Sequence, residues 1–405
     1  MNKAAVSLHH ERTLYDGWRS IVVSLYMTLV GYGVLVGIPV ISTAWVTLLG
    51  FSEVEVGRVA GADLGGLSAG AIFTAVCIAR MDRRLLVLLG LIIAVTANAL
   101  CLKFVDYDQV LWLRLGAGFG SGIYTAVAVA CLGASSKPAR AYNAMLFAFA
   151  FSQALELHIL PQLSMNGIYL VFIGCFLFTL PFLRWIPPRP VDKALDVELE
   201  VKGEDDKPHV ERRHVPAYVP WLCLAAMFAT YINIGAYWTY IELASLDGGA
   251  TPSWVSKVLV WSSFCSIVGC LFATLLSDRF GLARPLLVTL VTMSLIVGML
   301  ANGITDRTLL ISVFSFKLLW IFIDVYQMST IANVDHSGRF AALMPGAQGL
   351  GQIVGPNLAA SILGFNFGYS GVFIMCAGAA LTGMAVYAFM YLRLKRTIPA
   401  LAYAG

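Results

Sequence analysis

The chain has 405 residues, of which 59% are hydrophobic and 12% are charged, and its net charge is +4. Soluble domains carry about 25% charged residues, so this composition excludes an ordinary soluble protein. The apolar runs are also too long and continuous for the strict alternation of a membrane β-barrel. The composition therefore predicts an all-α polytopic membrane protein.

Twelve apolar runs are long enough to cross a bilayer, whose core of about 30 Å requires roughly 20 residues of helix. We expect spans at 20–44, 55–79, 85–105, 109–132, 140–163, 167–186, 217–244, 253–276, 285–304, 308–332, 339–364 and 369–392. A polar stretch divides them six and six. Its prolines and mixed charges are typical of a solvated linker, and a regulatory docking site is the alternative.

The spans define a plan of five segments. We expect a cytoplasmic N-terminal segment at 1–19, a six-helix bundle at 20–186, a cytoplasmic linker at 187–216, a second six-helix bundle at 217–392 and a cytoplasmic tail at 393–405. This orientation places 21 of the 27 Lys and Arg residues on the cytoplasmic side, in agreement with the positive-inside rule. We therefore expect a multi-pass protein of the cell (inner, cytoplasmic) membrane with both termini in the cytoplasm. The net charge is then a topology signal, and nucleic acid is not an expected partner.

Glycines spaced four residues apart occur in two spans. They are Gly61, Gly65, Gly66 and Gly70 in the second span, and Gly351 and Gly355, followed by Pro356, in the eleventh. Small residues at this spacing let helix backbones approach closely in lipid. We interpret them as close contacts in a bundle that moves, and ordinary tight packing with a proline kink is the alternative.

A charged turn occurs twice, each time between two apolar runs. The first copy holds Asp82, Arg83 and Arg84, and the second holds Asp278, Arg279, Gly281 and Arg284. The two aspartates are 196 positions apart, as expected for a transporter built from two similar halves. An aspartate at such a turn can cap a helix N-terminus and pair with arginine. We predict that both turns form a cytoplasmic gate; the alternative is that the arginines act only as topology signals.

Ionisable residues within the spans carry most of the functional information. Each costs about 2.5–3.5 kcal/mol near mid-bilayer on insertion scales and so needs a partner or water. At about 1.5 Å per residue, Asp63, Arg114 and Glu156 all lie in the outer half of the first bundle. A carboxylate that shares a buried arginine can exchange protons when the pair is disturbed. We predict a proton-coupling element, and a static buried ion pair is the alternative.

Two of these motifs resemble the major facilitator superfamily of secondary transporters. Asp278-Arg279-x-Gly281, with the degenerate copy Asp82-Arg83-Arg84, is similar to the loop motif G-x-x-x-D-R-x-G-R-R of that family, although the first copy lacks both glycines. The stretch that begins at Arg114 and includes Gly118 and Gly120 is similar to the motif R-x-x-x-G-x-G. The resemblance implies two bundles with pseudo-two-fold symmetry, alternating access and a role for the arginine in proton coupling.

The resemblance also implies that the first, fourth, seventh and tenth spans line a central cavity and that the second and eleventh meet between the halves. The expected cavity residues are Ser24, Thr28, Tyr32, Tyr231, Asn233, Tyr237, Lys317, Trp320 and Asp324. The last three follow i, i+3, i+7 spacing and share one helix face. We assign Trp238 and Tyr240 to the membrane interface instead. Aromatic faces with the cations Arg114 and Lys317 favour a small organic anion with an aromatic part.

These observations predict a secondary active transporter, proton-coupled by symport or antiport, that moves a small organic solute. The alternatives are a proton-driven drug or metabolite efflux antiporter and a non-transporting membrane sensor or assembly partner. The sequence has no P-loop or hydrolase motif, so we expect no enzyme activity. None of the eight cysteines has metal-ligand spacing, so we expect no cofactor and no metal. The expected partners are a small-molecule substrate, protons and the lipid bilayer, with the chain acting as a monomer.

Overall fold

The structure is a computed structural model that describes residues 17–78, 80–133, 135, 138–187, 218–280, 283–334 and 339–397. Over these residues the chain forms α-helices, short 3-10 segments and turns, without a β-strand. This confirms the all-α fold class. Most of the expected N-terminal segment, most of the linker, the end of the tail and Gly281 lie outside the described residues.

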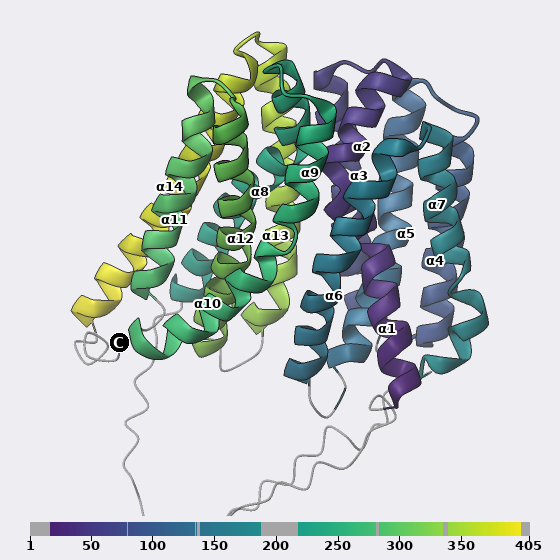
Figure 1. Ribbon diagram of the computed structural model, residues 1–405. Coiled ribbons are helices and arrows are strands. Elements are labelled where there is room, and N and C mark those ends of the chain that lie inside the picture. Colours follow the sequence, from purple (N-terminus) through teal and green to yellow (C-terminus); the bar gives the residue numbers. More distant parts are fainter. Residues whose placement is uncertain are drawn as a thin grey trace, which may run out of the picture.

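The helices form two groups that stand side by side, with the helices of each group running up and down the bundle (Figure 1). The first group is α1 (Trp18–Gly31), α2 (Gly33–Leu49), α3 (Glu53–Cys77), α4 (Arg83–Cys101), α5 (Tyr107–Gly133), α6 (Pro138–Ile159), η2 (Leu160–Gln162), α7 (Met165–Leu177) and η3 (Leu180–Trp185). The second group is α8 (Tyr218–Asp247), α9 (Pro252–Ser262), α10 (Cys265–Phe280), α11 (Ala283–Gly298), η5 (Met299–Asn302), α12 (Asp306–Val334), α13 (Arg339–Gly364) and α14 (Gly368–Thr397). Each expected span coincides with one helix or with a consecutive pair.

The first and eighth expected spans are each interrupted. Tyr32 separates α1 from α2, and it is flanked by Gly31 and Gly33, which are poor helix formers. The hydrogen bonding continues through this break, because the Tyr32 N–H donates to the Thr28 carbonyl and the Val36 N–H donates to the Tyr32 carbonyl, both at 3.0 Å. The interruption is therefore a local bend in one continuous span.

Eleven segments of the described chain are long and apolar enough to cross a membrane. The expected span that is not among the eleven is the eleventh in chain order, α13, although this helix has 26 residues. It packs against α3 and α8 in the middle of the molecule, and it carries Gln348, Gln352 and Asn357 on its length. Since α13 stands parallel to its neighbours (Figure 1), it occupies the position of a twelfth span.

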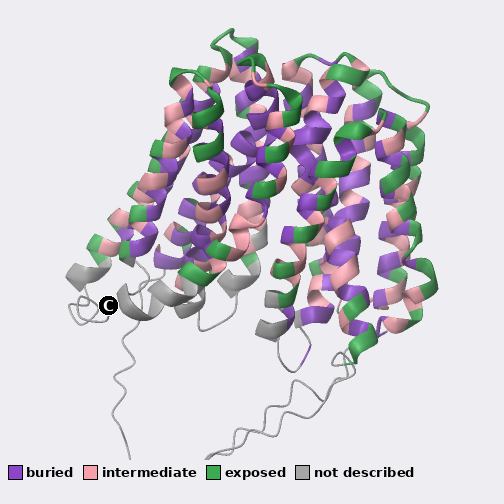
Figure 2. Ribbon diagram, viewed as in Figure 1, coloured by how far each residue is buried: buried purple, intermediate pink, exposed green. Residues whose placement is uncertain are grey.

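Apolar side chains are found both inside the bundle and on its outer surface. The buried residues concentrate where helices face one another, and exposed residues alternate with them around the outside (Figure 2). The exposed side chains include large apolar ones such as Val76, Trp112 and Leu295, each 69–70% exposed. Apolar surface of this extent is a liability in water and is the expected surface in lipid.

The two halves meet through α3 against α13, α2 against α8, and α6 against α9. We call the end of the bundle that holds residues 50–52 and 248–251 the upper end, as in Figure 1, and the end that holds Gly17, Asp82 and Tyr218 the lower end. The α3–α13 contact confirms that the second and eleventh spans meet between the halves.

The spaced glycines lie at three different helix contacts. On Gly61 and Gly65 an added Cβ would meet α13, and on Gly66 and Gly70 it would meet the backbone of α5. On Gly351 and Gly355 it would meet α8 instead. Pro356, in the same turn, lies close to Gly57 and Gly235. Two of these three contacts are therefore within one half, and only the first lies between the halves.

Candidate functional site

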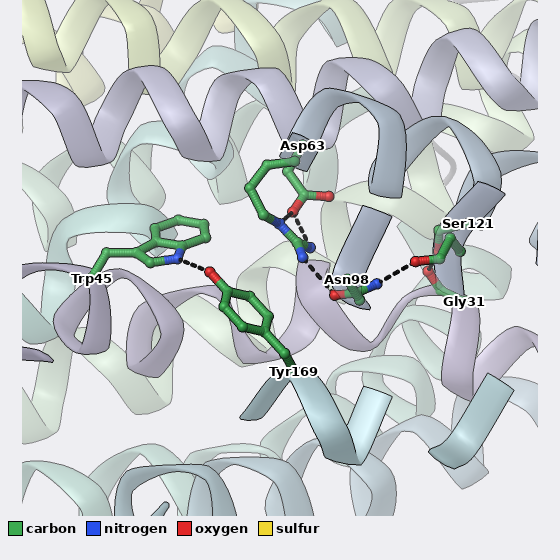
Figure 3. Close-up of polar contacts among 8 residues, drawn as sticks. Gly31, Trp45, Asp63, Asn98, Ser121 and Tyr169 are labelled. Carbon is green, nitrogen blue, oxygen red and sulfur yellow. Dashed lines mark hydrogen bonds and ion pairs between the residues drawn. The ribbon is translucent and has the colours of Figure 1, made fainter. Parts of the chain in front are cut away.

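The first half contains a buried ion pair between α3 and α5. Asp63 and Arg114 are each 2% exposed, and Arg114 Nε donates to Asp63 Oδ2 at 2.6 Å, with Nη2 beside the same oxygen. Arg114 Nη1 donates to Asn98 Oδ1 at 2.7 Å, and Asn98 Nδ2 donates to the Ala94 carbonyl at 2.7 Å. The guanidinium thus has one charged and one neutral acceptor, each held on its own helix (Figure 3).

The helices around this pair are packed tightly on both sides of it. A Cβ on Gly118 would clash with the Asp63 backbone carbonyl, so this glycine is what lets α5 approach α3. On the other side, the Arg114 Cζ lies 5.7 Å from the centroid of the Tyr169 ring. The Tyr169 hydroxyl accepts a hydrogen bond of 3.3 Å from Trp45 Nε1 (Figure 3). The charge of Arg114 is therefore enclosed and satisfied.

Glu156 does not join this pair, since its carboxylate lies against the first turns of α2 and forms no ion pair with Arg114. Ser152 Oγ donates to Glu156 Oε1 at 3.2 Å, and the carboxylate lies beside Gly33 and Gly37, near the break between α1 and α2. Its Oε2 is buried and has no hydrogen-bond partner in the described part of the chain. The three residues expected together are thus a pair and a separate carboxylate.

The second half contains a buried lysine between aromatic rings. Lys317 is 2% exposed, and its Nζ lies 3.5 Å from the centroid of the Trp238 ring and 4.6 Å from that of Trp320. Lys317 forms no ion pair with any residue in the described ranges, so no carboxylate neutralises it there. Indole faces attract an ammonium group, but they carry no negative charge that would neutralise it.

Asp324 lies on the same helix as Lys317 and contacts α8. The Tyr231 hydroxyl donates to Asp324 Oδ1 at 2.7 Å. Nearby, Gln327 Nε2 donates to Thr230 Oγ1 at 3.0 Å, while its buried Oε1 lacks a partner among the described residues. Tyr32, at the break in the first span, is close enough to Tyr231 for an electrostatic interaction. This region therefore lies where the second half faces the bend of the first.

Other expected cavity residues make contacts inside one bundle. Asn233 Nδ2 donates to a carbonyl of α14 at 2.9 Å, and the Tyr237 hydroxyl lies 2.8 Å from Ser312 Oγ of α12. Ser24 and Thr28 of α1 are buried as well. The structure thus brings five of the nine expected residues into the contact between α8 and α12: Tyr231, Tyr237, Lys317, Trp320 and Asp324. Tyr32 faces this contact from the first half, and Ser24, Thr28 and Asn233 lie buried in their own halves.

The assignment of Trp238 and Tyr240 to the membrane interface is wrong, since each is 1% exposed or less. Trp238 covers Lys317, and the Tyr240 hydroxyl donates to the Glu53 carbonyl at the start of α3, at 2.7 Å. Position near the end of a span does not distinguish an aromatic residue that faces lipid from one that faces another helix.

The first charged turn makes its described contacts within its own half, at the lower end. Asp82 Oδ1 accepts a hydrogen bond of 2.7 Å from the Arg84 backbone N–H and so caps α4. The Arg84 side chain donates to two carbonyls in 184–186, at 2.7 and 3.0 Å. Arg83 is buried, with Nη1 3.5 Å from Cys131 Sγ.

The second charged turn is only partly described. Asp278 and Arg279 end helix α10, and their side chains, like all of Gly281, lie outside the described residues. Arg284, at the start of α11, is exposed. The expected gate between the two turns therefore stays a prediction.

Contacts that the sequence did not reveal join the two halves at the upper end. Arg58 of α3 donates to Asn357 Oδ1 and Ser361 Oγ of α13, each at 2.8 Å. On α8, Tyr240 reaches the start of α3, as described above, and Glu242 lies beside Thr43 of α2. We call these three contacts, made by Arg58, Tyr240 and Glu242, the upper contact layer. The one indication of this layer in the sequence was Arg58, because few Lys and Arg residues lie on the outer side of the protein.

Comparisons with known proteins agree with this geometry. The family profile of the Major Facilitator Superfamily matches residues 21–333. No curated protein matches the chain. Among solved structures, the nucleoside transporter NupG aligns with a TM-score of 0.69 at 12% identity over 92% of this chain and 98% of that one. A D-xylose-proton symporter aligns with a TM-score of 0.67 at 17% identity over 92% and 97%, and the human organic anion transporter MFSD10 with 0.62 at 12% over 91% and 97%.

Proposed function

This chain belongs to the Major Facilitator Superfamily, and we propose that it is a proton-coupled secondary transporter that binds a small organic anion with an aromatic part at Lys317. It is a multi-pass membrane protein of a transporter family. Proteins of known structure that share its fold include a nucleoside transporter, a peptide transporter, an organic anion transporter and a D-xylose-proton symporter. The fold alone therefore does not select a substrate, and the choice rests on the buried side chains.

One observation carries the substrate class: Lys317 is buried between two indole rings without a carboxylate among the described residues. A buried unpaired ammonium is costly in a low-dielectric surrounding, so an anionic ligand that pairs with it binds favourably. The same indole faces suit a flat apolar group. Tyr231 and Asp324 then supply polar groups beside the ligand.

The orientation of the molecule and the contacts at its upper end indicate which side of the membrane is closed. We place the lower end in the cytoplasm, because the first charged turn and most Lys and Arg residues of the sequence belong to that side. The upper contact layer joins the halves at the other end. This arrangement corresponds to a state closed to the outside, in which the ligand exchanges with the cytoplasm. Alternating access requires these contacts to separate.

Proton coupling needs a carboxylate that can change its charge. A carboxylate that is paired with a cation stays ionised and cannot serve. Asp63 is held by Arg114, so we assign this pair to maintaining the structure of the first half. Glu156 has a buried oxygen without a partner in the described chain and lies at the bend that faces the second half. We therefore assign proton exchange in the first half to Glu156.

Uptake by purified protein in liposomes tests this proposal. With an acidic exterior, labelled benzoate should accumulate above the background of protein-free liposomes, and a protonophore should abolish the accumulation. Lys317→Gln should lose most of this uptake, whereas Lys103→Gln, a substitution of an exposed lysine, should keep it. Equal uptake by wild type and Lys317→Gln would contradict the proposed site, and benzoate accumulation that requires an acidic interior instead of an acidic exterior would establish antiport.

A further inference from the structure

We propose that Glu242 is a proton-binding site that controls closure of the upper end. The proposal rests on the proton-coupled function given above, and it adds a second carboxylate, at a place separate from the substrate region. Glu242 lies near the end of α8, five residues before Asp247. It is 8% exposed, and its Oε2 is buried with no hydrogen-bond partner within the described chain.

The position of Glu242 is between the two halves. Its carboxyl group lies beside the Thr43 hydroxyl of α2, and α2 packs against α8. Two residues earlier on α8, Tyr240 bonds to the Glu53 carbonyl of α3, and on α3 Arg58 bonds across to α13. Separation of the halves at the upper end breaks this layer and brings water to Glu242.

No charged group described in the structure compensates Glu242. Among the helices packed against α8, α3 carries one cation, Arg58, which is engaged with α13. The other charged residues of α3 are acids: Glu53, Glu55 and Asp63. On α12, Lys317 lies at Trp238 and Asp324 at Tyr231. Asp306 and Arg307, at the upper end of α12, are exposed, and no ion pair joins either of them to a described residue. The titratable group that α14 brings to this end is Tyr369, whose ring lies 6.2 Å from that of Tyr240.

The remaining neighbours of α8 supply no counter-charge to the carboxyl group either. The α9 helix carries Lys257, which forms no ion pair in the described chain. From α2 the neighbouring group is the uncharged Thr43, and α13 contributes the amides Gln352 and Asn357. Glu242 therefore lies in a closed interface without a cation.

The consequence for proton binding follows from burial. An ionised carboxylate without a cation is strongly disfavoured inside protein, and a protonated one is not. Glu242 thus holds a proton while the upper end is closed and releases it to water when that end opens. Because binding and conformation are linked, protons from the outside medium stabilise the closed upper end, and alkaline medium favours the open one.

The predicted linkage has a measurable slope. For a single proton, the ratio of open to closed molecules changes by at most about tenfold per pH unit, and it rises with pH. A proton taken up at Glu242 from the outside medium closes the upper end, and it returns to that medium when the end opens again. Glu242 therefore sets the pH dependence of closure, and it does not itself carry a proton across the membrane.

Distance measurements on purified protein test the inference without any substrate. Spin labels attached through p-acetylphenylalanine at positions 103 and 307, which are exposed at the upper ends of the two halves, leave the eight native cysteines unchanged. Double electron–electron resonance spectroscopy measures the distance between the two labels. From pH 5 to pH 9, the fraction of molecules with the longer label-to-label distance should grow. Glu242→Gln should keep the short distance at all pH values, and Glu242→Asp should restore a pH-dependent population.

The matched control is Asp247→Asn, an exposed acid on the same helix, which should behave like the unsubstituted protein. A pH response in Glu242→Gln equal to that of wild type would overturn the inference, and so would a wild-type distance that does not change with pH. Neither result bears on benzoate uptake at Lys317, which the liposome assay decides separately. The failure of one proposal is thus distinguishable from the failure of the other.

Discussion

The two buried cations of this protein, Arg114 and Lys317, lie in corresponding helices of the two halves but in opposite surroundings. Arg114 bonds to Asp63 and Asn98, so its charge is neutralised and its donors are used. Lys317 lies between Trp238 and Trp320 and has no carboxylate in the described chain. Under the proposal given above, the paired charge maintains the structure of the first half, and the unpaired one receives the ligand.

Removal of Arg114 gives the largest expected effect on stability. Arg114→Met leaves Asp63 as a buried carboxylate without a cation, which should lower the free energy of unfolding by about 3–5 kcal/mol. Titration with sodium dodecyl sulfate, followed by circular dichroism, measures this change. Because the cost comes from the orphaned carboxylate, Arg114→Met combined with Asp63→Leu should recover most of it. A single variant as stable as wild type would show that the pair is not structural.

Removal of Lys317 should change stability in the opposite direction. Lys317→Met replaces an unpaired buried charge with an apolar side chain of similar length, which should raise the free energy of unfolding by about 1–4 kcal/mol. The same detergent titration, run on both variants, shows whether each substitution raises or lowers the free energy of unfolding. If Lys317→Met destabilised the protein as much as Arg114→Met does, a hidden partner for the lysine would be required.

Substitution of Gly118 tests how closely α3 and α5 must approach for the pair to form. Gly118→Ala places a methyl group against the Asp63 carbonyl, and such overpacking should cost about 1–3 kcal/mol. Gly174→Ala is the matched control, since a Cβ at this helical glycine meets nothing within 4 Å. Equal stability of the two variants would mean that the backbone around Asp63 adapts without cost.

Replacement of an indole face should have the smallest effect. Trp238→Phe keeps an apolar ring over Lys317 but weakens the cation–π contact. The free energy of unfolding should fall by about 0.5–1 kcal/mol. A double-mutant cycle with Lys317→Met isolates this contribution by detergent titration. In the Lys317→Met background the loss should disappear, and a loss of the same size there would assign it to packing.

The sequence predicted the fold and the two cations, but it predicted few of their partners. Twelve apolar runs fixed the number and order of spans, because lipid requires long continuous helices. Distance from a span end gave the depth of Asp63 and Glu156, but not the direction in which each side chain points. For this reason Glu156 was expected beside Arg114, whereas the structure places it against α2.

The rest could not be predicted because it depends on contacts between helices that are distant in the sequence. Asn98 is a single polar residue in an apolar run, and its role became visible only from its hydrogen bond to Arg114. Trp238 was assigned to the membrane interface, since a position near a span end is typical of interfacial aromatic residues. The bonds of Arg58 to Asn357 and Ser361 join positions about 300 residues apart.

Binding of a matched pair of probes tests the central claim, that the unpaired Lys317 receives an anion. Purified protein in lipid nanodiscs is titrated with benzoate and with benzamide, which differ in charge but not in ring, while tryptophan fluorescence is recorded. We predict that benzoate binds wild type at least 30-fold more tightly than it binds Lys317→Gln, which corresponds to about 2 kcal/mol, and that benzamide binds both equally weakly. Equal affinity of wild type for benzoate and benzamide, or equal affinity of both proteins for benzoate, would contradict the account.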